Sequence, residues 1–325
     1  MRALFVTLGF LLNIAPVFAE PLNLTATPLD RFALLTNATS FGPFTWRGGL
    51  ELTSTNKKFG GLSGLAMGND CTSLLAVSDA GSWVKADVTY ADNKIAGLTS
   101  ASIAPILDSS GKPPRSKASG DAEALASLGS GRYMVGFESF PRIGIYNISK
   151  SGLDSRFQLL KSPKAVTEGP PNAELESVGR ITTGRWKNYN IAISENYADQ
   201  RNNVRGWLWQ SWKTVPFTIK RYGNYNITDL VVLPAGDVLI LERGVGTSLL
   251  PGMAIRRFRA SAITMAGLVE PELLLEAKVP FYVIDNMEGL AVCERDGELR
   301  VNLVSDNNFN TELQRTLLLQ FSYKP

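Results

Sequence analysis

A five-fold internal repeat is the feature of this sequence that most restricts its fold. Each copy contains an apolar run that opens with a small or acidic residue, then a polar turn, then a second apolar run that ends in an acid. The copies begin near residues 63, 123, 176, 228 and 288, so they are 52 to 60 residues apart. A repeat of this length with Gly-rich turns is typical of a β-propeller with one four-stranded blade per copy. We therefore predict an all-β fold with a single five-bladed propeller. A sixth, degenerate blade in residues 95–115 or 260–284 is the alternative.

The last copy supplies three strand-like runs before the chain ends. Residues 43–52, PFTWRGGLEL, form another strand-like stretch that precedes the first copy. When the N-terminal part of the chain adds a strand to the last blade, the ring closes and no sheet edge is exposed there. We expect residues 43–52 to close the ring in this way.

The first residues have the pattern of an export signal. Met1 and Arg2 are followed by an apolar run from Ala3 to Val17, and Val17 and Ala19 are small residues suited to signal peptidase. We predict a signal peptide over residues 1–19, cleaved after Ala19, and one propeller domain over residues 20–325, located in the periplasm or secreted. The run is too short for a retained membrane span, and no other stretch approaches 18 apolar residues.

Cys71 and Cys293 are the two cysteines of the chain, and each follows the first apolar run of its copy. They belong to the first and last copies, which ring closure makes neighbours. An exported protein folds where disulfides persist. We hypothesise a Cys71–Cys293 disulfide that helps to hold the ring closed.

The sequence contains no histidine, which excludes Ser-His-Asp and Cys-His catalysis and every metal site built on imidazole. Positive and negative residues nearly balance, at 33 Lys and Arg against 30 Asp and Glu, and they are mixed along the chain. This argues against a nucleic-acid or membrane partner, and we expect a monomer. Any chemistry must come from carboxylates, basic groups, hydroxyls or an oxygen-bound metal.

Repeated carboxylates mark the first strand of the copies. In a propeller this strand lines the channel, so we expect a ring made of Glu123, Glu176, Asp229 and Glu288, with Ser63 in the first copy. Converging carboxylates resist ionisation unless a cation compensates them. Oxygen ligands of this kind suit Ca²⁺, which takes six to eight of them in flexible geometry. We predict a calcium site with the ligands Glu288, Glu176, Glu123, Asp79 and Asp306.

A second set of acids ends the second strand of each copy: Asp79, Glu138, Glu195, Glu242 and Asp306. Two interpretations stay open. Each acid could pair with the basic residue that begins the third strand, which is a purely structural role. Alternatively, Arg142, Arg243 and Arg315 face the channel and hold a small anionic or ester substrate, such as a phosphate ester. Metal-activated water would then attack the ester, with Glu288, Glu176 and Asp306 as catalytic residues.

Five segments appear in a fixed order along residues 40–323: GGLSGLA…VSDAG, DAEAL…FES, AELESV…SEN, ITDLVVLPAGDVLILER and NMEGLAV…LVSDNNFN. This set resembles the phytase-like domain of exported bacterial proteins, described as an esterase-like activity of phytase. The last segment is also similar to the E-G-[LM]-A motif of the calcium-dependent β-propeller phytases, in which the glutamate helps to hold a calcium cluster. The resemblance carries this role to Glu288 and, by repeat position, to Glu176 and Glu123.

The D-D-P-A-[IV]-W segment of the alkaline phytases is absent, and their Lys- and Arg-rich phosphate pocket is not in recognisable order. The resemblance therefore implies the fold, export and calcium-dependent ester hydrolysis, rather than phytate cleavage in particular. A non-catalytic binding or scaffold propeller with a structural metal is the alternative, because propellers carry many unrelated functions.

Overall fold

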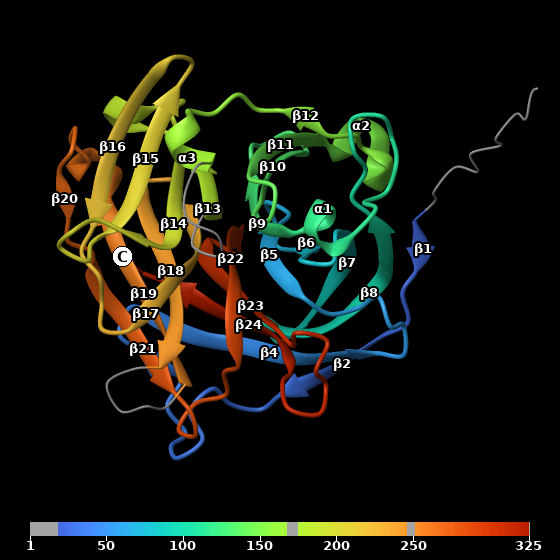
Figure 1. The fold of residues 1–325 in the computed structure, drawn as a ribbon. Helices are drawn as coiled ribbons and strands as arrows, with labels where there is room; N and C mark the ends of the chain where they lie inside the picture. The colour runs from blue at the N-terminus through green and yellow to red at the C-terminus, as the bar shows by residue number, and fades with distance from the viewer. Residues whose placement is uncertain (1–18, 168–174, 246–250, 325) are drawn as a thin grey trace, which may run out of the picture.

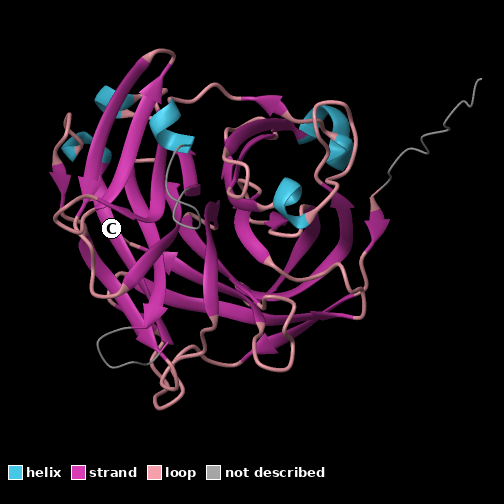
Figure 2. Cartoon of the chain, viewed as in Figure 1, coloured by secondary structure: helices cyan, strands magenta, loops and turns pink. Residues whose placement is uncertain are grey.

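The chain forms a ring of five β-sheets around a central channel (Figure 1), as the computed structural model shows. The structure describes residues 19–167, 175–245 and 251–324, so most of the predicted signal peptide lies outside the described residues. Strands dominate the described part, and its helices are short segments in the connections (Figure 2). None of these helices is long and apolar enough to span a membrane.

The five sheets are the blades that the repeat predicts. From the channel outward, blade one contains β5 (Leu62–Met67), β6 (Ser73–Ser78), β7 (Ser82–Ala91), β8 (Lys94–Pro105) and β1 (Glu20–Pro21). Blade two contains β9 (Ala122–Ser127), β10 (Arg132–Phe137), β11 (Arg142–Asn147) and β12 (Gln158–Leu159). Blade three contains β13 (Leu175–Arg180), β14 (Asn190–Ala198), β15 (Val204–Gln210), β16 (Lys213–Ile219) and β20 (Leu268–Val269).

Blade four contains β17 (Tyr225–Val232), β18 (Asp237–Val245), β19 (Pro251–Arg259) and β21 (Glu272–Lys278). Blade five contains β22 (Asn286–Arg295), β23 (Glu298–Asp306), β24 (Thr316–Tyr323), β4 (Phe44–Ser54) and β2 (Leu24–Leu29), and β3 (Ser40–Phe41) pairs with β4. The connections hold α1 (Lys117–Gly120), α2 (Ile148–Ser151) and α3 (Lys164–Thr167). The six-bladed alternative is wrong, because residues 95–115 and 260–284 supply outer strands to blades one, three and four.

The inner strands β5, β9, β13, β17 and β22 pack side by side in chain order, and β22 contacts β5. Apolar residues from each pair of adjacent blades form one hydrophobic cluster, so the core is divided among the five blade interfaces. The inner strands have side chains buried on both faces, since both of their faces meet protein. This explains why the repeat is read as continuous apolar runs rather than as strict alternation.

Ring closure follows the prediction for residues 43–52. β4 pairs with β24 in the antiparallel direction, so an N-terminal strand completes the last blade, and Figure 1 shows blue β4 beside red β24. Cys71, in the turn after β5, and Cys293, in β22, form a disulfide across a sequence separation of 222 residues. The disulfide hypothesis is therefore confirmed. Next to it, the Tyr90 hydroxyl donates to the Cys71 carbonyl at 3.0 Å and accepts from Gln320 Nε2 at 2.9 Å.

Removing the disulfide should lower the free energy of unfolding by about 2–4 kcal/mol, because the open chain gains conformational entropy when it unfolds. Urea unfolding followed by tryptophan fluorescence, with and without reductant, measures this change. The double variant Cys71→Ser, Cys293→Ser is the control, and its unfolding curve should not respond to reductant. A wild-type curve that ignores reductant, together with two thiols labelled in the unfolded but unreduced protein, would contradict the pairing.

Candidate functional site

A β-bulge occurs at the same point of every inner strand. One residue of the inner strand has no partner on the adjacent strand, and bulges of this kind re-aim side chains next to functional sites. The bulged residues are Ser63, Glu123, Glu176, Thr228 and Glu288. The inner strands all run in the same sense through the ring, so these side chains gather at one mouth of the channel.

The end of the second strand adds another side chain per blade to this mouth. Strand register pairs Asp306 with Asn286 and Arg243 with Asn226. In blade one the backbone N–H of Asp79 donates to the Gly61 carbonyl, and in blade two that of Glu138 donates to the Asp121 carbonyl. These bonds place Asp79 and Glu138 at the same position of their blades. The corresponding positions in the five blades are Asp79, Glu138, Glu195, Arg243 and Asp306. The mouth therefore carries four acids and one arginine in this layer.

In blade four, both the bulged residue and the residue that ends the second strand differ by one position from the sequence prediction. Thr228, not Asp229, is its bulged residue, and Arg243, not Glu242, occupies the second layer. Asp229 is fully buried, and it accepts hydrogen bonds from the backbone N–H groups of Leu230 and Leu290, each at 2.7 Å. Asp229 thus joins two inner strands, and the prediction that it belongs to the ring of acids is wrong.

Glu242 pairs with an arginine of the third strand, which is the structural role that the sequence analysis left open for the acids at the end of the second strands. Its carboxylate accepts two hydrogen bonds from the Arg256 guanidinium, at 2.6 and 2.7 Å, and both side chains are buried. The arginines at the start of the third strand in blades three and five make other contacts. Arg205 donates to the Ala198 carbonyl and lies over the Tyr197 ring, and Arg315 lies 3.8 Å from both Glu51 and Asp285. The buried Glu242–Arg256 pair of blade four is therefore not repeated by Arg205 in blade three or by Arg315 in blade five.

Three carboxylates of blade two come close enough to share a metal ion. One oxygen from each of Asp121, Glu123 and Glu138 lies within 4.8 Å of the others. Asp121 is held in place by the β10–β11 turn, because its Oδ2 accepts hydrogen bonds from the backbone N–H and the hydroxyl of Ser139. Of these three acids, only Glu123 is among the five metal ligands that the sequence predicts. Asp121 and Glu138 were not predicted as ligands, because the repeat does not show how the turn brings them together.

Two positively charged side chains, Lys117 and Arg243, lie among these acids. The Lys117 ammonium of α1 is 2.8 Å from Asp79 and 3.0 Å from Asp121. The Arg243 guanidinium is 2.7 Å from Glu288 and 3.9 Å from Glu195. Each cation thus partly neutralises one side of the mouth, and the carboxylates outnumber the cations.

The predicted substrate-binding arginines separate in the structure. Arg243 lies at the mouth, where it pairs with carboxylates. Arg142 turns away into the interface of blades one and two and donates to the carbonyls of Phe140 at 2.9 Å and Ser119 at 2.6 Å. Arg315 lies at the rim, with 41 % of its side chain exposed. The structure therefore brings Glu288, Glu176, Glu123, Asp79 and Asp306 to one mouth with only one of the three arginines.

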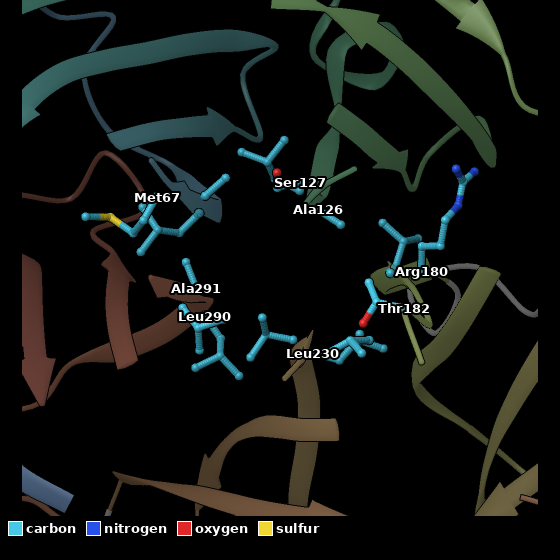
Figure 3. Close-up of a pocket in the computed structure, with 16 residues that line it drawn as sticks. Met67, Ala126, Ser127, Arg180, Thr182, Leu230, Leu290 and Ala291 are labelled. Carbon is cyan, nitrogen blue, oxygen red and sulfur yellow. The ribbon is translucent and has the colours of Figure 1, made fainter. Parts of the chain in front are cut away.

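The other end of the channel is apolar. A cavity of about 120 Å³ is lined by the continuation of all five inner strands, with Leu65, Leu125, Val178, Leu230 and Leu290 among the lining residues (Figure 3). Arg180 and Thr182 lie at its edge, and Arg180 is bonded to Asn190 at 3.0 Å. The residues that line this end include no carboxylate, so the acids of the channel lie at the opposite mouth.

A family model described as "Phytase-like: Esterase-like activity of phytase" matches residues 57–309. The chain belongs to the phytase-like family. No curated protein matches the sequence. Similar solved structures include the N-terminal domain of Nup159, at 11 % identity and a TM-score of 0.38 over 92 % of this chain and 100 % of that chain. Another is an S. cerevisiae complex of dbp5 bound to nup159, gle1, ip6 and adp, at 10 % identity and a TM-score of 0.38 over 89 % of this chain and 97 % of that chain.

Burial governs the protonation of the mouth of this phytase-like propeller. Burial raises the pKa of Glu288 to about 7, against the opposing charge of Arg243. Burial also raises the pKa of Asp306 to about 6, and the nearby Asp79 adds to the rise. The pKa values of Glu123 and Glu176 lie well above the ordinary glutamate value, because of burial and the neighbouring carboxylates. A bound cation would reverse these shifts, since it favours the ionised carboxylates.

Without a divalent metal, the stability of the phytase-like propeller should fall on going from about pH 5 to about pH 7.5. The folded pKa values of Glu288 and Asp306 exceed those of unfolded carboxylates, so folding retains protons that the unfolded chain has already released. This stabilisation is full below the unfolded pKa, near pH 4, and is lost through the folded pKa. We expect a loss on the order of 2 kcal/mol, measured by urea unfolding in EDTA.

Glu288→Gln should flatten this pH dependence, because Glu288 and Asp306 are the two groups with folded pKa values of about 7 and about 6, and the variant removes one of them. Glu294→Gln, on the same strand and exposed, is the matched control and should keep the wild-type slope. An EDTA-treated protein that becomes more stable between about pH 5 and about pH 7.5 would contradict the raised pKa values.

Proposed function

We propose that this phytase-like propeller is an exported, calcium-dependent hydrolase of phosphate or other esters that acts at the acidic mouth of its channel. The observation that carries the proposal is the cluster of Asp121, Glu123 and Glu138, whose oxygens approach within 4.8 Å of one another. Such a cluster is costly unless a cation compensates it. Membership of a family described by an esterase-like activity of phytase supports an ester as the substrate.

The donor set fits calcium. The mouth offers oxygen ligands only, and the sequence contains no histidine to favour zinc or copper. Asp79 Oδ1 is buried and has no hydrogen-bond partner among the described residues, which leaves one carboxylate oxygen ready for a ligand. Asp121, Glu123 and Glu138 would hold the ion, with Asp79, Glu176 and Asp306 nearby. When bound, calcium supplies a Lewis acid that polarises the ester and eases deprotonation of water.

The residues of the chain have separate tasks in this proposal. Glu176, whose pKa is raised by burial, donates a proton to the leaving group, and Asp306 accepts the proton of the attacking water. Glu288 accepts from Asn286 Nδ2 at 2.7 Å and pairs with Arg243, so it orients that guanidinium. The Lys117 ammonium, 63 % exposed at the mouth, binds the anionic oxygens of the substrate.

Export to the periplasm or the medium is part of the proposal. It is supported by the predicted signal peptide and by the Cys71–Cys293 disulfide, because such bonds persist in oxidising compartments. A monomer without a nucleic-acid or membrane partner fits the mixed and nearly balanced charges.

A non-catalytic binding propeller with a structural metal is the second candidate. One observation favours it: Arg243 is engaged by carboxylates, and Arg142 and Arg315 are bonded away from the cluster. The mouth therefore lacks a group of free arginines for a highly charged phosphate ester. A calcium-induced rise in stability without turnover would support this second function, because a ligand that binds only the folded state stabilises it.

Hydrolysis of p-nitrophenyl phosphate, phytate and short acyl esters should appear with calcium and disappear with a chelator. Glu123→Gln removes one charge of the three-carboxylate cluster, so it should reduce turnover at least about 100-fold and reduce the calcium-induced rise in Tm. Glu294→Gln should retain both properties. Absence of turnover for every ester, with and without calcium, would reject the hydrolase.

Lys117→Gln should tighten calcium binding by roughly tenfold, because it removes a positive charge that is held against Asp79 and Asp121. Isothermal titration calorimetry of the metal-free protein measures the affinity. Lys112→Gln is the control, since Lys112 is exposed in the same connection. Weaker binding in Lys117→Gln would show instead that this lysine holds the carboxylates in position for the metal.

A further inference from the structure

A second cavity lies outside the channel, at the interface of blades one and two. Its volume is about 350 Å³, and it is formed by the connection between β8 and α1 on one side and by β11 on the other. Pro113, Pro114, Arg115, Phe137, Arg142 and Phe157 are among the residues that line it. None of the metal-binding candidates lines this cavity, so it is a different site from the acidic mouth.

Arg142 provides an unused cationic surface in this cavity. Its guanidinium lies 4.0 Å from the centre of the Phe137 ring and 5.8 Å from that of Phe157. Two of its N–H groups donate to the carbonyls of Phe140 and Ser119. A guanidinium has five N–H donors, and among the described residues Arg142 uses two of them, in the bonds to Phe140 and Ser119.

Asp108 also lines this cavity, but its carboxylate is hydrogen-bonded within its own turn. Asp108 Oδ1 accepts from the backbone N–H groups of Ser110 and Lys112 and from the Ser110 hydroxyl, so it closes its own turn. Arg115 is exposed on the cavity wall and adds a second positive charge. The charge of the cavity is therefore positive, beside a mouth whose charge is negative.

The other walls offer apolar and aromatic surface. Tyr146 is buried, and its hydroxyl donates to the Leu107 carbonyl at 3.3 Å, so only its ring faces the cavity. Phe157 and the two prolines complete a surface that suits a planar or apolar group. An arginine stacked on an aromatic ring keeps its N–H edge available for a planar or tetrahedral oxyanion.

We propose that this cavity binds a small organic anion, whose phosphate, phosphonate or carboxylate accepts hydrogen bonds from Arg142 while its aromatic or apolar body packs against Phe157 and Pro114. Glu138 follows Phe137 directly, and Ser119, which accepts from Arg142, belongs to α1 together with Lys117. The cavity and the carboxylate cluster therefore lie on two sides of the β10–β11 turn. If the proposed hydrolase function holds, the cavity selects esters that carry a second, non-reacting anionic group.

Phenylphosphonate is a suitable probe because it has the anion and the ring but no ester to hydrolyse. Its binding to the full chain should be measured by calorimetry in EDTA, so that metal at the acidic mouth does not contribute. We expect saturable binding, at least tenfold weaker in Arg142→Gln, and no binding of benzyl alcohol, which lacks the anion. Arg201→Gln, an exposed arginine on blade three, is the control and should bind as the wild type does.

Ser109→Trp is the second variant, because Ser109 is an exposed residue of the cavity wall and makes none of the contacts of Arg142. Its indole should fill the cavity and block binding without changing the Tm. No saturable binding by the wild type, or equal binding by the wild type, Arg142→Gln and Ser109→Trp, would overturn the proposal. Binding that these variants abolish, in a protein that hydrolyses no ester, would uphold the cavity and reject the hydrolase.

Discussion

The mouth of the channel depends on close contacts between neighbouring inner strands, which occur one residue after the bulge in blades one, four and five. A Cβ atom on Gly64 would come within 2.8 Å of the Leu125 nitrogen, and one on Gly289 within 3.0 Å of the Leu65 nitrogen. In blade four Asp229 occupies this position and accepts from the Leu290 nitrogen. Because the strands approach so closely, the bulged side chains point to the mouth and gather there.

The charge collected in this way opposes folding, and other contacts must offset it. Lys117 and Arg243 compensate part of it. The hydroxyls of Ser63 and Thr228, at the two bulges that lack a carboxylate, donate to the carbonyls of Ala122 and Met287 in the next blade. Bulges without an acid thus add hydrogen bonds between blades. The disulfide and the β4–β24 pairing then hold the ring closed against the remaining repulsion.

The sequence predicts the ring and its closure well, because blade number and the closing strand depend on the spacing of apolar runs. It predicts the members of the mouth less well. In the Thr228-Asp229-Leu230 segment, a shift of the strand register by one residue decides whether Thr228 or Asp229 lies at the bulge. The periodicity of apolar residues does not show this register. Asp121 and Glu138 meet through a turn, and Arg142 leaves the mouth because Phe137 and the Ser119 carbonyl bind it. Such contacts depend on packing between blades rather than on the repeat.

The two ends of the channel explain why a metal would be coupled to the stability of the whole ring. The other end is lined mainly by apolar residues such as Leu65, Leu125 and Leu290, and Arg180 at its edge is bonded to Asn190. Compensation of the buried acids therefore comes from the mouth itself. Lys117 is bound there from a four-residue helix that belongs to the connection between blades one and two. A cation bound by Asp121, Glu123 and Glu138 would compensate the carboxylates of blade two, beside the Lys117 contacts that already link Asp121 to Asp79 of blade one. Such a metal would add to the same ring of strands that the disulfide and the β4–β24 pairing hold closed, because β9, which carries Glu123, packs between β5 and β13.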